Sequence, residues 1–503
     1  MRRKFPIPVR WPCPKAIALL PAALVLAGCA AGPNFKPPVP PNVAGYTAQP
    51  LAATAAAPGV AAGGAQHFES GADIPADWWT LFHSPVLNAL IAKALAHNHD
   101  LKAAQAALKV AQEDVLAQRG TFFPSVSAGF DASRQKASTA LAPVPNFPEV
   151  PQEYQYNLFT PQLTISYAPD LFGLNRRTRE SLQAQAQAAR FQMIAAWTTL
   201  TSNVVVTAVE EASLRGQVGA TRKLIGLERH SLAILKLRLQ HGDASRLDVA
   251  AQETQLAQTQ TGLPALVKQL AQTQHALAVL VGAFPDQAPA KTFVLADLQL
   301  PADLPVSLPS KLVAQRPDVR QARANLHAAS AAIGIAAAER LPNIELTANA
   351  GSTALAISKV FTSGTGFWGI AASLTAPIFE GGELLHQERA AKAAYVEAAE
   401  QYRGTVLGAF QNVADTLVAL EQDAKALKAA VTAERAAKTT LDLSQLQLEH
   451  GYIGTFELLV AEQAYQQARI ALIDAEANRF ADTAALYQAL GGGWWHHSEL
   501  SRQ

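Results

Sequence analysis

The sequence predicts a mixed, mainly helical fold, in which one chain supplies long coiled-coil helical hairpins and four β-strands. Three observations lead to this prediction. The chain repeats itself after about 210–220 residues, each copy contains two segments of strict apolar–polar alternation, and a very long helical stretch follows each pair of segments. Duplication of one unit indicates a pseudo-symmetric architecture rather than a single asymmetric active site.

The repeat is visible as matched residues at two constant spacings. The matched pairs are Asp100 with Asp318, Pro124 with Pro342, His241 with His450, Asp248 with Glu457, Glu253 with Glu462 and Gly282 with Gly491. The first two pairs are 218 positions apart and the others 209. We assign the difference to the connector within the first strand pair, which is proline-rich around 142–151 and longer than its counterpart.

Four strands are predicted from alternation with a period of two residues. They cover 125–132 and 159–167 in the first copy, and 343–350 and 368–375 in the second. Because all four segments alternate strictly, each is expected to expose one apolar and one polar face.

Helices are expected on both sides of each strand pair: an opening helix, a very long helix and, after a glycine turn, a shorter returning helix. Their ranges are 86–119, 176–240 and 244–281 in the first copy, and 309–340, 383–449 and 455–489 in the second. In the second long helix, apolar residues alternate spacings of four and three, which is typical of a coiled-coil seam. This seam consists of Val413, Leu417, Leu420, Ala424, Leu427 and Val431.

The N-terminus has the pattern of an exported lipoprotein. Arg2, Arg3 and Lys4 precede a short apolar stretch, and the sequence Leu-Ala-Gly-Cys at 26–29 resembles a lipobox. The resemblance implies cleavage before Cys29 and acylation of its thiol. A buried core cysteine is the alternative, which is disfavoured because Cys29 directly follows the apolar stretch. Because the next residue is Ala30 rather than an inner-membrane retention aspartate, the resemblance also implies sorting to the outer membrane.

The sequence divides into five expected parts. These are a signal peptide at 1–28, a lipidated tether at 29–75, a first structural repeat at 76–292, a second at 293–495 and a C-terminal tail at 496–503. The tether is expected to be extended, because it is rich in Ala, Gly and Pro.

Composition excludes several classes of protein. Lys and Arg total 41 and Asp and Glu total 40, so the balanced charge gives no sign of a nucleic-acid partner. The two cysteines lie at positions 13 and 29, which leaves no disulfide in a mature chain. Beyond the leader there is no apolar run of about 18 residues, so any membrane crossing would use the strands.

Four strands cannot close a barrel in lipid, because an open sheet leaves backbone groups unpaired at its edges. The smallest membrane barrels have about eight strands. Several copies of the chain must therefore combine, with two giving eight strands and three giving twelve. A barrel of about eight strands has no aqueous lumen, whereas a duct requires more.

The chain resembles the outer membrane efflux protein family of TolC-like channels, and within it the NodT-like lipoproteins. The features that carry this resemblance are the duplication, the lipobox, the motif Asp-Trp-Trp-Thr-Leu-Phe at 77–82, the Ala-Pro turns at 168–172 and 376–379, and the helix turn at 242–249. It implies a homotrimer with a twelve-stranded transmembrane β-barrel in the outer membrane, continued by a helical α-barrel into the periplasm.

The resemblance also implies a function. The chain would be the outer membrane channel of a tripartite efflux system, a passive duct for small molecules delivered by a periplasmic adaptor and an inner-membrane pump of the RND, ABC or MFS type. One alternative is a duct for type I protein secretion. A second is a periplasmic adaptor lipoprotein, which would have one hairpin rather than two.

The resemblance places a constriction at the start of the returning helix of the second hairpin. The candidate gate residues are Phe456, Glu457, Val460 and Gln463. Phe456, Val460 and Gln463 share one helix face, so three copies would form stacked rings. Val460 stands where family members often have an aspartate ring, which favours a hydrophobic gate. The alternative is a buried helix seam with no gating role.

The resemblance further implies a link between the hairpins in the closed state. Tyr452 and Asp248 match the family positions that form it, and Phe456 replaces the accompanying arginine. Arg246 is the candidate substitute for that arginine.

No enzymatic function, cofactor or bound metal is expected. The histidine clusters at 97–99 and 496–497 have no carboxylate at the spacing of a zinc motif, and both are interpreted as solvated surface. The sequence also has no glycine-rich phosphate loop and no nucleophile elbow.

Overall fold

The computed structural model describes residues 30–502 apart from 44, 48, 50, 139–152 and 289–292. The predicted signal peptide, Cys29 and the proline-rich connector lie outside the described residues. The chain forms two compact units. The first contains Val110–Ala186, Ala324–Ala399 and the N-terminal segment to Pro37. The second contains Pro38–Lys109, Gln187–Arg323 and Glu400–Gln503, so each unit draws on both repeats.

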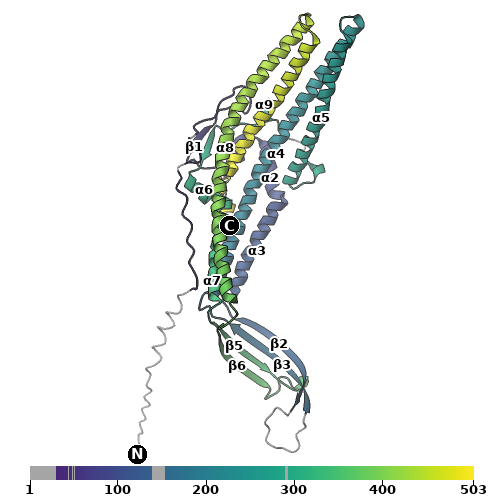
Figure 1. The fold of residues 1–503 in the computed structure, drawn as a ribbon. Coiled ribbons are helices and arrows are strands. Elements are labelled where there is room, and N and C mark those ends of the chain that lie inside the picture. Colours follow the sequence, from purple (N-terminus) through teal and green to yellow (C-terminus); the bar gives the residue numbers. More distant parts are fainter. Residues whose placement is uncertain are drawn as a thin grey trace, which may run out of the picture. The chain divides into compact units, whose positions relative to one another are not determined.

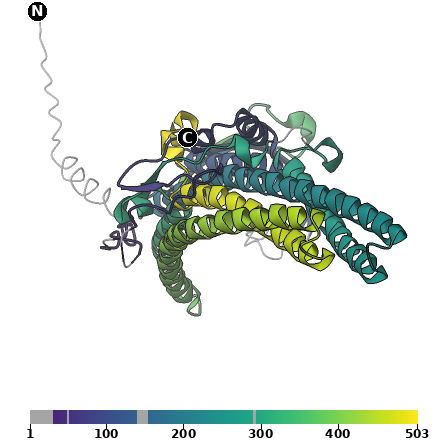
Figure 2. The same cartoon turned by 90° about the horizontal axis from the view of Figure 1, so that it is seen from above.

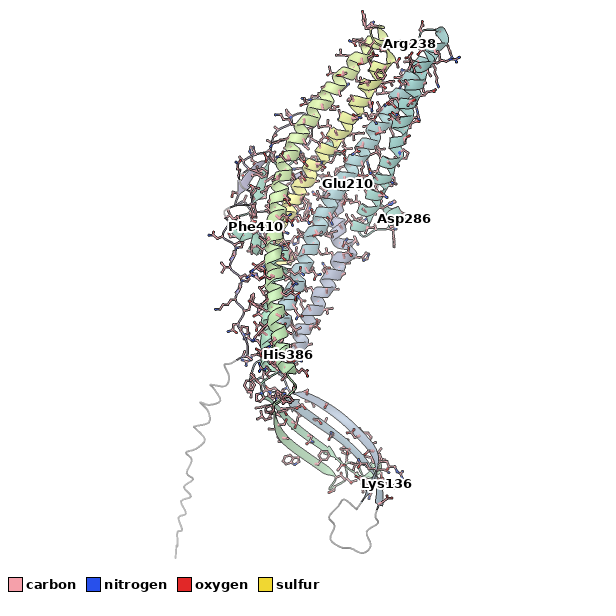
Figure 3. The ribbon with its side chains drawn as sticks, viewed as in Figure 1. Lys136, Glu210, Arg238, Asp286, His386 and Phe410 are labelled. Carbon is pink, nitrogen blue, oxygen red and sulfur yellow. The ribbon has the colours of Figure 1, made fainter. Side chains whose placement is uncertain are left out.

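The first unit holds a four-stranded antiparallel sheet in the order β2-β3-β5-β6 (Figure 1). The strands are β2 (Ser125–Ser138), β3 (Glu153–Tyr167), β5 (Asn343–Ser352) and β6 (Gly366–Thr375). All four predicted strands are therefore confirmed, and β2 and β3 extend farther than alternation alone indicated. In Figure 3, Lys136 lies near the C-terminal end of β2, where its ammonium group pairs with Glu153 at 2.7 Å.

The register of this sheet sorts side chains into apolar and polar rows. Val126, Ile165, Ala348 and Ile370 lie opposite one another across the four strands. The adjacent row consists of Ser127, Thr164, Asn349 and Gly369. Because neighbouring positions point to opposite faces, one face of the sheet is apolar and the other polar.

The second unit holds most of two helical hairpins that lie side by side (Figures 1 and 2). The first hairpin is α4 (Leu174–His241) with α5 (Arg246–Leu280), and the second is α8 (Glu383–Glu449) with α9 (Thr455–Ala489). These bounds confirm the predicted hairpins to within three residues. Gly242 and Gly451 turn the chain with φ of 84° and 75°, a conformation that favours glycine. All six residues of the predicted seam on α8 are buried, which confirms that prediction.

The prediction of one continuous opening helix in each copy is wrong. The first is split into α2 (Pro85–His97) and α3 (His99–Gly120), and the second into α6 (Pro309–Gln315) and α7 (Pro317–Ala338). Asn98 breaks the first because its Oδ1 accepts from the Leu101 N–H at 2.9 Å, which caps a new helix. In the second, Pro317 forces Arg316 into extended backbone, with φ of −67° and ψ of 125°.

The extended tether predicted up to residue 75 is wrong for its second half. β1 (His67–Ser70) pairs in parallel with β4 (Asp303–Val306), a two-stranded sheet that the sequence did not indicate. Ala62 and Gln66 are fully buried, and the Gln66 amide donates to Pro301 O and Thr483 Oγ1, each at 3.1 Å. This segment is therefore part of the second unit's packed structure.

A cluster of aromatic side chains forms one part of the core of the second unit. The motif at 77–82 folds as a 3-10 helix, η1 (Trp78–Phe82), and inserts Trp78 and Phe82 against α9. Phe82 meets Phe480 edge-on, with ring centroids 6.1 Å apart. The motif that carried the family resemblance is thus a packing element.

The remaining elements are short. They are η3 (Pro285–Gln287), η4 (Leu295–Asp297), η5 (Ile357–Lys359), η6 (Trp494–His496) and α10 (Ser498–Arg502). Within the described residues, none of the helices has the length and apolar character needed to cross a membrane.

Candidate functional site

The turn of the first hairpin is held by a reciprocal cap. Ser245 Oγ accepts from the Asp248 N–H at 3.1 Å, and Asp248 Oδ2 accepts from the Ser245 N–H at 2.8 Å and from its hydroxyl at 2.7 Å. This is a capping box, which satisfies helix N–H groups that would otherwise lack a partner. The Ser245 backbone N–H, followed by its hydroxyl, lowers the pKa of Asp248.

The turn of the second hairpin has no capping box. Gly454 occupies the N-cap of α9 and has no side chain to accept a hydrogen bond, while Glu457 stands in the first helical turn. The two copies thus differ in how firmly their turns are capped.

The four candidate gate residues share the exposed side of α9. Phe456 is 70% exposed and Val460 52% exposed, and Glu457 and Gln463 are exposed as well. The opposite side of α9 is buried: Leu458 and Ala461 pack with Leu441 of α8. The candidates therefore do not lie in a seam buried within one chain.

The closed-state link residues are not joined within the chain. Tyr452 is 80% exposed, and its ring neighbours His450 with centroids 6.2 Å apart. In the described part of the chain no hydrogen bond connects Tyr452 to Asp248, whose carboxylate is engaged by Ser245. Arg246 is exposed at the start of α5.

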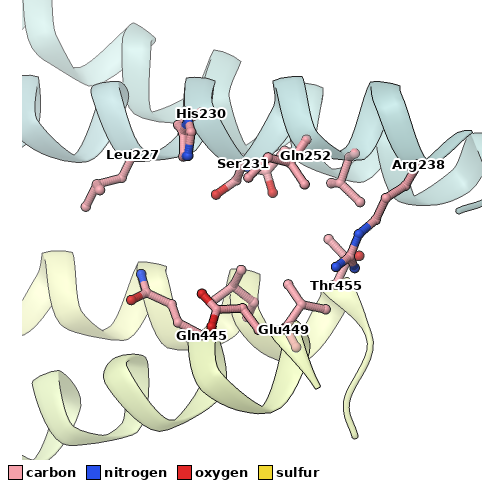
Figure 4. A pocket seen from close by; sticks show the side chains of 12 residues that line it. Leu227, His230, Ser231, Arg238, Gln252, Gln445, Glu449 and Thr455 are labelled. Atoms are coloured by element: carbon pink, nitrogen blue, oxygen red, sulfur yellow. The ribbon is translucent and has the colours of Figure 1, made fainter. Parts of the chain in front are cut away.

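A cavity of about 290 Å³ between the two hairpins was not predicted from the sequence (Figure 4). One wall is formed by α4 and α5, with Leu227, His230, Ser231, Arg238 and Gln252. The other is formed by α8 and α9, with Gln445, Glu449 and Thr455. Figure 3 places Arg238 near the turn of the first hairpin. Two buried acids, Glu228 and Glu462, lie next to residues that line this cavity. The sequence repeat singles out only Glu462, as the counterpart of Glu253.

The first histidine cluster lies at the surface as expected, but the expectation is wrong for His497, which packs edge-on against Trp197 with ring centroids 5.7 Å apart and has a buried Nδ1. His97 and His99 are exposed, and His496 is half-exposed with its Nε2 2.7 Å from Asp73 Oδ2. Within the part of the chain that the structure describes, no group of three or more His, Cys, Asp or Glu side chains could hold a metal ion.

Comparison with known proteins identifies the family. The model of the outer membrane efflux protein family matches residues 90–283 and 308–492. The chain belongs to this family. One matched segment lies in each predicted repeat, and together they cover both helical hairpins and all four strands of the large sheet.

Named relatives of this efflux protein agree with the assignment. The pyoverdine export outer membrane protein OpmQ of Pseudomonas putida is 29% identical, over 83% of this chain and 88% of the relative. The probable efflux pump outer membrane protein TtgC of Pseudomonas putida is 28% identical, over 97% of both chains. Among solved structures, the MtrE outer membrane channel of Neisseria gonorrhoeae in its open state is 27% identical, with a TM-score of 0.78 over 93% of this chain and 99% of that one.

These findings confirm the predicted fold class and the predicted role. The efflux protein is mainly helical with four strands in its large sheet, as in the TolC-like channels that it resembles structurally. It is the outer membrane channel component of an efflux system, and its family consists of channels rather than enzymes.

Proposed function

We propose that three copies of this efflux protein close their sheets into one twelve-stranded barrel. The observation that carries this proposal is the apolar face of the four-stranded sheet, where Val126, Leu163, Ile165, Trp368 and Ile370 are all exposed. In the described residues, β2 and β6 each pair on one side only, so both edges are available to neighbouring copies. A barrel of two copies would be filled by its own side chains, whereas three copies leave room for a lumen.

The polar row of the sheet supports a water-filled lumen. With the apolar face turned to lipid, Ser127, Thr164 and Asn349 would line the interior of the barrel. The efflux protein would then be a passive duct, fed by a periplasmic adaptor and an inner-membrane pump. The names of its relatives, which refer to pyoverdine export and efflux pumps, favour small molecules over the alternative of secreted proteins.

A matched pair of substitutions tests this arrangement. Ile370→Arg places a charge on the apolar face, and Asn349→Arg places the same charge on the polar face one residue pair away. An arginine facing lipid at mid-depth costs about 2–4 kcal/mol, whereas one facing a lumen does not. We expect Ile370→Arg to reduce the amount of trimer in outer membrane fractions severalfold and Asn349→Arg to leave it unchanged, with native mass spectrometry reporting three chains. Equal effects of the two variants, or a dimer, would contradict the proposal.

We infer that the ends of the hairpins form the gate of this duct. Phe456 and Val460 present apolar side chains from the uncovered side of α9, and three copies would bring them together as rings that exclude water. The closed-state link of Asp248, Tyr452 and Arg246 belongs to the same proposal and would join neighbouring hairpins in the assembled trimer.

We also propose that Cys29 carries lipid and fixes the mature N-terminus to the outer membrane. Labelling cells with a palmitate analogue tests this directly. The natural chain should be labelled and should lose its leader, whereas Cys29→Ser should be unlabelled. Labelling of the serine variant would refute the anchor without affecting the duct.

A further inference from the structure

Two buried carboxylates from different hairpins lie near one another in the second unit. Glu228 is on α4 and Glu462 on α9, and both side chains are fully buried. Thr259 Oγ1 donates to Glu228 Oε1 at 2.8 Å, and Gln255 Nε2 donates to the same oxygen at 3.4 Å. The charge of Glu228 acts on Glu462 across the two hairpins, and α5 supplies the hydrogen-bond donors to Glu228.

The pair has too few donors for two negative charges. Glu228 Oε2, both carboxylate oxygens of Glu462 and the Oε1 atom of Gln252 make no hydrogen bond of good geometry in the described part of the chain, and only the side chains of Gln252 and Ser231 lie close enough to Glu462 to act as weak donors. An ionised carboxylate buried without donors is strongly destabilising, so such a group takes up a proton instead. Burial, together with the charge of Glu228, raises the pKa of Glu462 from its ordinary 4.5 to about 7, although Gln252 and Ser231 oppose the rise. Burial also raises the pKa of Glu228.

Within the described residues, no cation is found to compensate the charge of either carboxyl group. Lys223, Tyr465 and Arg469 line a second cavity between α4 and α9 and do not change the pKa of the pair. The charged and titratable groups lining the adjacent cavity are His230 and Arg238 on α4 and Glu449 on α8, while α5 and α9 contribute Gln252, Thr455 and Leu458. His230 and Glu449 are exposed, and no basic group lowers the pKa of either buried carboxyl. On the other side, α8 packs Leu441 and Leu448 against α9.

We propose that Glu228 and Glu462 form a proton-dependent latch between the hairpins. With a proton on the pair, α4 and α9 pack together at this level. Once both carboxylates are ionised, their repulsion and their need for water favour separation of the hairpins toward their turns, and the cavity gives water a route to the pair. The latch would regulate the gate described above, and to that extent it rests on the proposed duct.

The direction of the pH effect follows from the raised pKa of Glu462. The packed state binds the proton more tightly than the separated state, so packing is favoured fully below the ordinary pKa of 4.5. This advantage is lost as the pH rises toward about 7, and above that value both states are ionised and the balance no longer changes. Between these limits the ratio of separated to packed hairpins rises by up to about tenfold per pH unit.

The repeat supplies a matched control. Glu253 is the counterpart of Glu462 in the first copy, but it is half-exposed and pairs with Lys236 at 2.8 Å. Glu462→Gln mimics the protonated side chain at the latch, and Glu253→Gln makes the same chemical change at the surface.

Distance measurements in the assembled full chain test the proposal. Spin labels are attached at Leu247→Cys and Leu446→Cys, both exposed positions. The natural cysteines are kept, because Cys13 would leave with the leader and acylation would block the Cys29 thiol. Labelled chain is diluted into unlabelled chain, so that only distances within one chain are read. From pH 4.5 to 7.5 we expect the fraction of long distances to rise at least tenfold in this parent and in Glu253→Gln, and to stay low in Glu462→Gln.

Four outcomes decide the matter. A distance distribution that does not change with pH, or an undiminished pH response in Glu462→Gln, overturns the latch. A response that requires added Ca²⁺ and not a change of pH assigns the pair to a metal ion and also overturns it. Absence of conductance in lipid bilayers with the pH-dependent distances intact contradicts the duct and leaves the latch standing.

Discussion

The indole ring of Trp78 stacks on the phenol ring of Tyr487, with centroids 5.0 Å apart and an interplanar angle of 18°. Both side chains are fully buried, one in η1 and the other near the end of α9. The contact joins the segment that precedes the first hairpin to the last turns of the second. It therefore fastens together parts of the second unit that are far apart in the sequence.

Removing this contact should destabilise the second unit strongly. Trp78→Ala leaves a cavity the size of an indole ring, and such changes cost about 3–5 kcal/mol. Tyr487→Phe is the control, because the lost hydroxyl has no hydrogen-bond partner within the described residues and its removal should cost less than about 1 kcal/mol. Thermal unfolding of the purified protein in detergent measures both. Similar losses in the two variants would show that the stack is not the stabilising feature.

The cap at the first hairpin should make that turn sensitive to acid. Because hydrogen bonds from Ser245 lower the pKa of Asp248, the cap is formed at neutral pH and is lost as the pH falls through that lowered pKa. Ser245→Ala removes the cap at every pH and should cost about 1 kcal/mol locally. Hydrogen exchange of the first turns of α5 reports the effect. The start of α9, where Gly454 stands at the N-cap without a capping side chain, is the internal reference and should not change in the variant.

The sequence was sufficient for the elements whose signal is local. Strands with a period of two and helices with a period near 3.6 differ within any ten residues, so the bounds of the hairpins and strands were predicted closely. The breaks at Asn98 and Arg316 were missed because the apolar periodicity continues across them. An asparagine cap and a residue before proline were available as signals for both.

The burial of individual residues depends on tertiary packing and could not be predicted from the sequence. The segment before residue 70 has the composition of a linker, yet its small residues are required by close packing. A side chain at Gly63 would come within 1.8 Å of Ala57 O. Likewise, Glu462 and Glu253 are equivalent in the repeat, and only the fold buries one and exposes the other. Asp248 was predicted as a residue of the link between the hairpins. Its hydrogen bonds with Ser245 at the start of α5 were not predicted, because they depend on the local geometry of the turn.

A buried arginine should be essential for holding the N-terminal segment. Arg479 is fully buried and donates to Leu420 O at 3.0 Å, and to Thr54 Oγ1 and Gly64 O at 3.2 Å each. Arg479→Met leaves these acceptors without a charged donor and should cost at least about 3 kcal/mol. Arg435 is the matched control, since it makes one exposed hydrogen bond to Pro58 O at 2.8 Å.

Limited proteolysis between residues 50 and 70 distinguishes these two arginines. In Arg479→Met the segment should be cleaved much faster, because its docking to α9 is lost. In Arg435→Met cleavage should change by less than about fivefold, as expected for a contact worth at most about 1 kcal/mol. Equal protection of both variants would mean that β1 alone holds the segment.

The gate proposal predicts that Phe456 limits leakage through the closed duct, and the sequence repeat supplies a control residue for the test. Phe456 is 70% exposed on α9, and its counterpart in the first copy is Leu247, which is 77% exposed on α5. If rings of Phe456 exclude water from the closed duct, Phe456→Ala should raise the closed-state conductance in planar bilayers about tenfold, equivalent to about 1.4 kcal/mol off the barrier. Leu247→Ala removes a similar apolar group at the equivalent turn and should leave the leak unchanged, because the proposed constriction involves only the turn of the second hairpin. Increased leak in the Leu247 variant alone would move the gate to the first hairpin. No increase in either variant would leave the exposed face of α9 as a contact surface between chains, with its apolar residues serving assembly instead of closure.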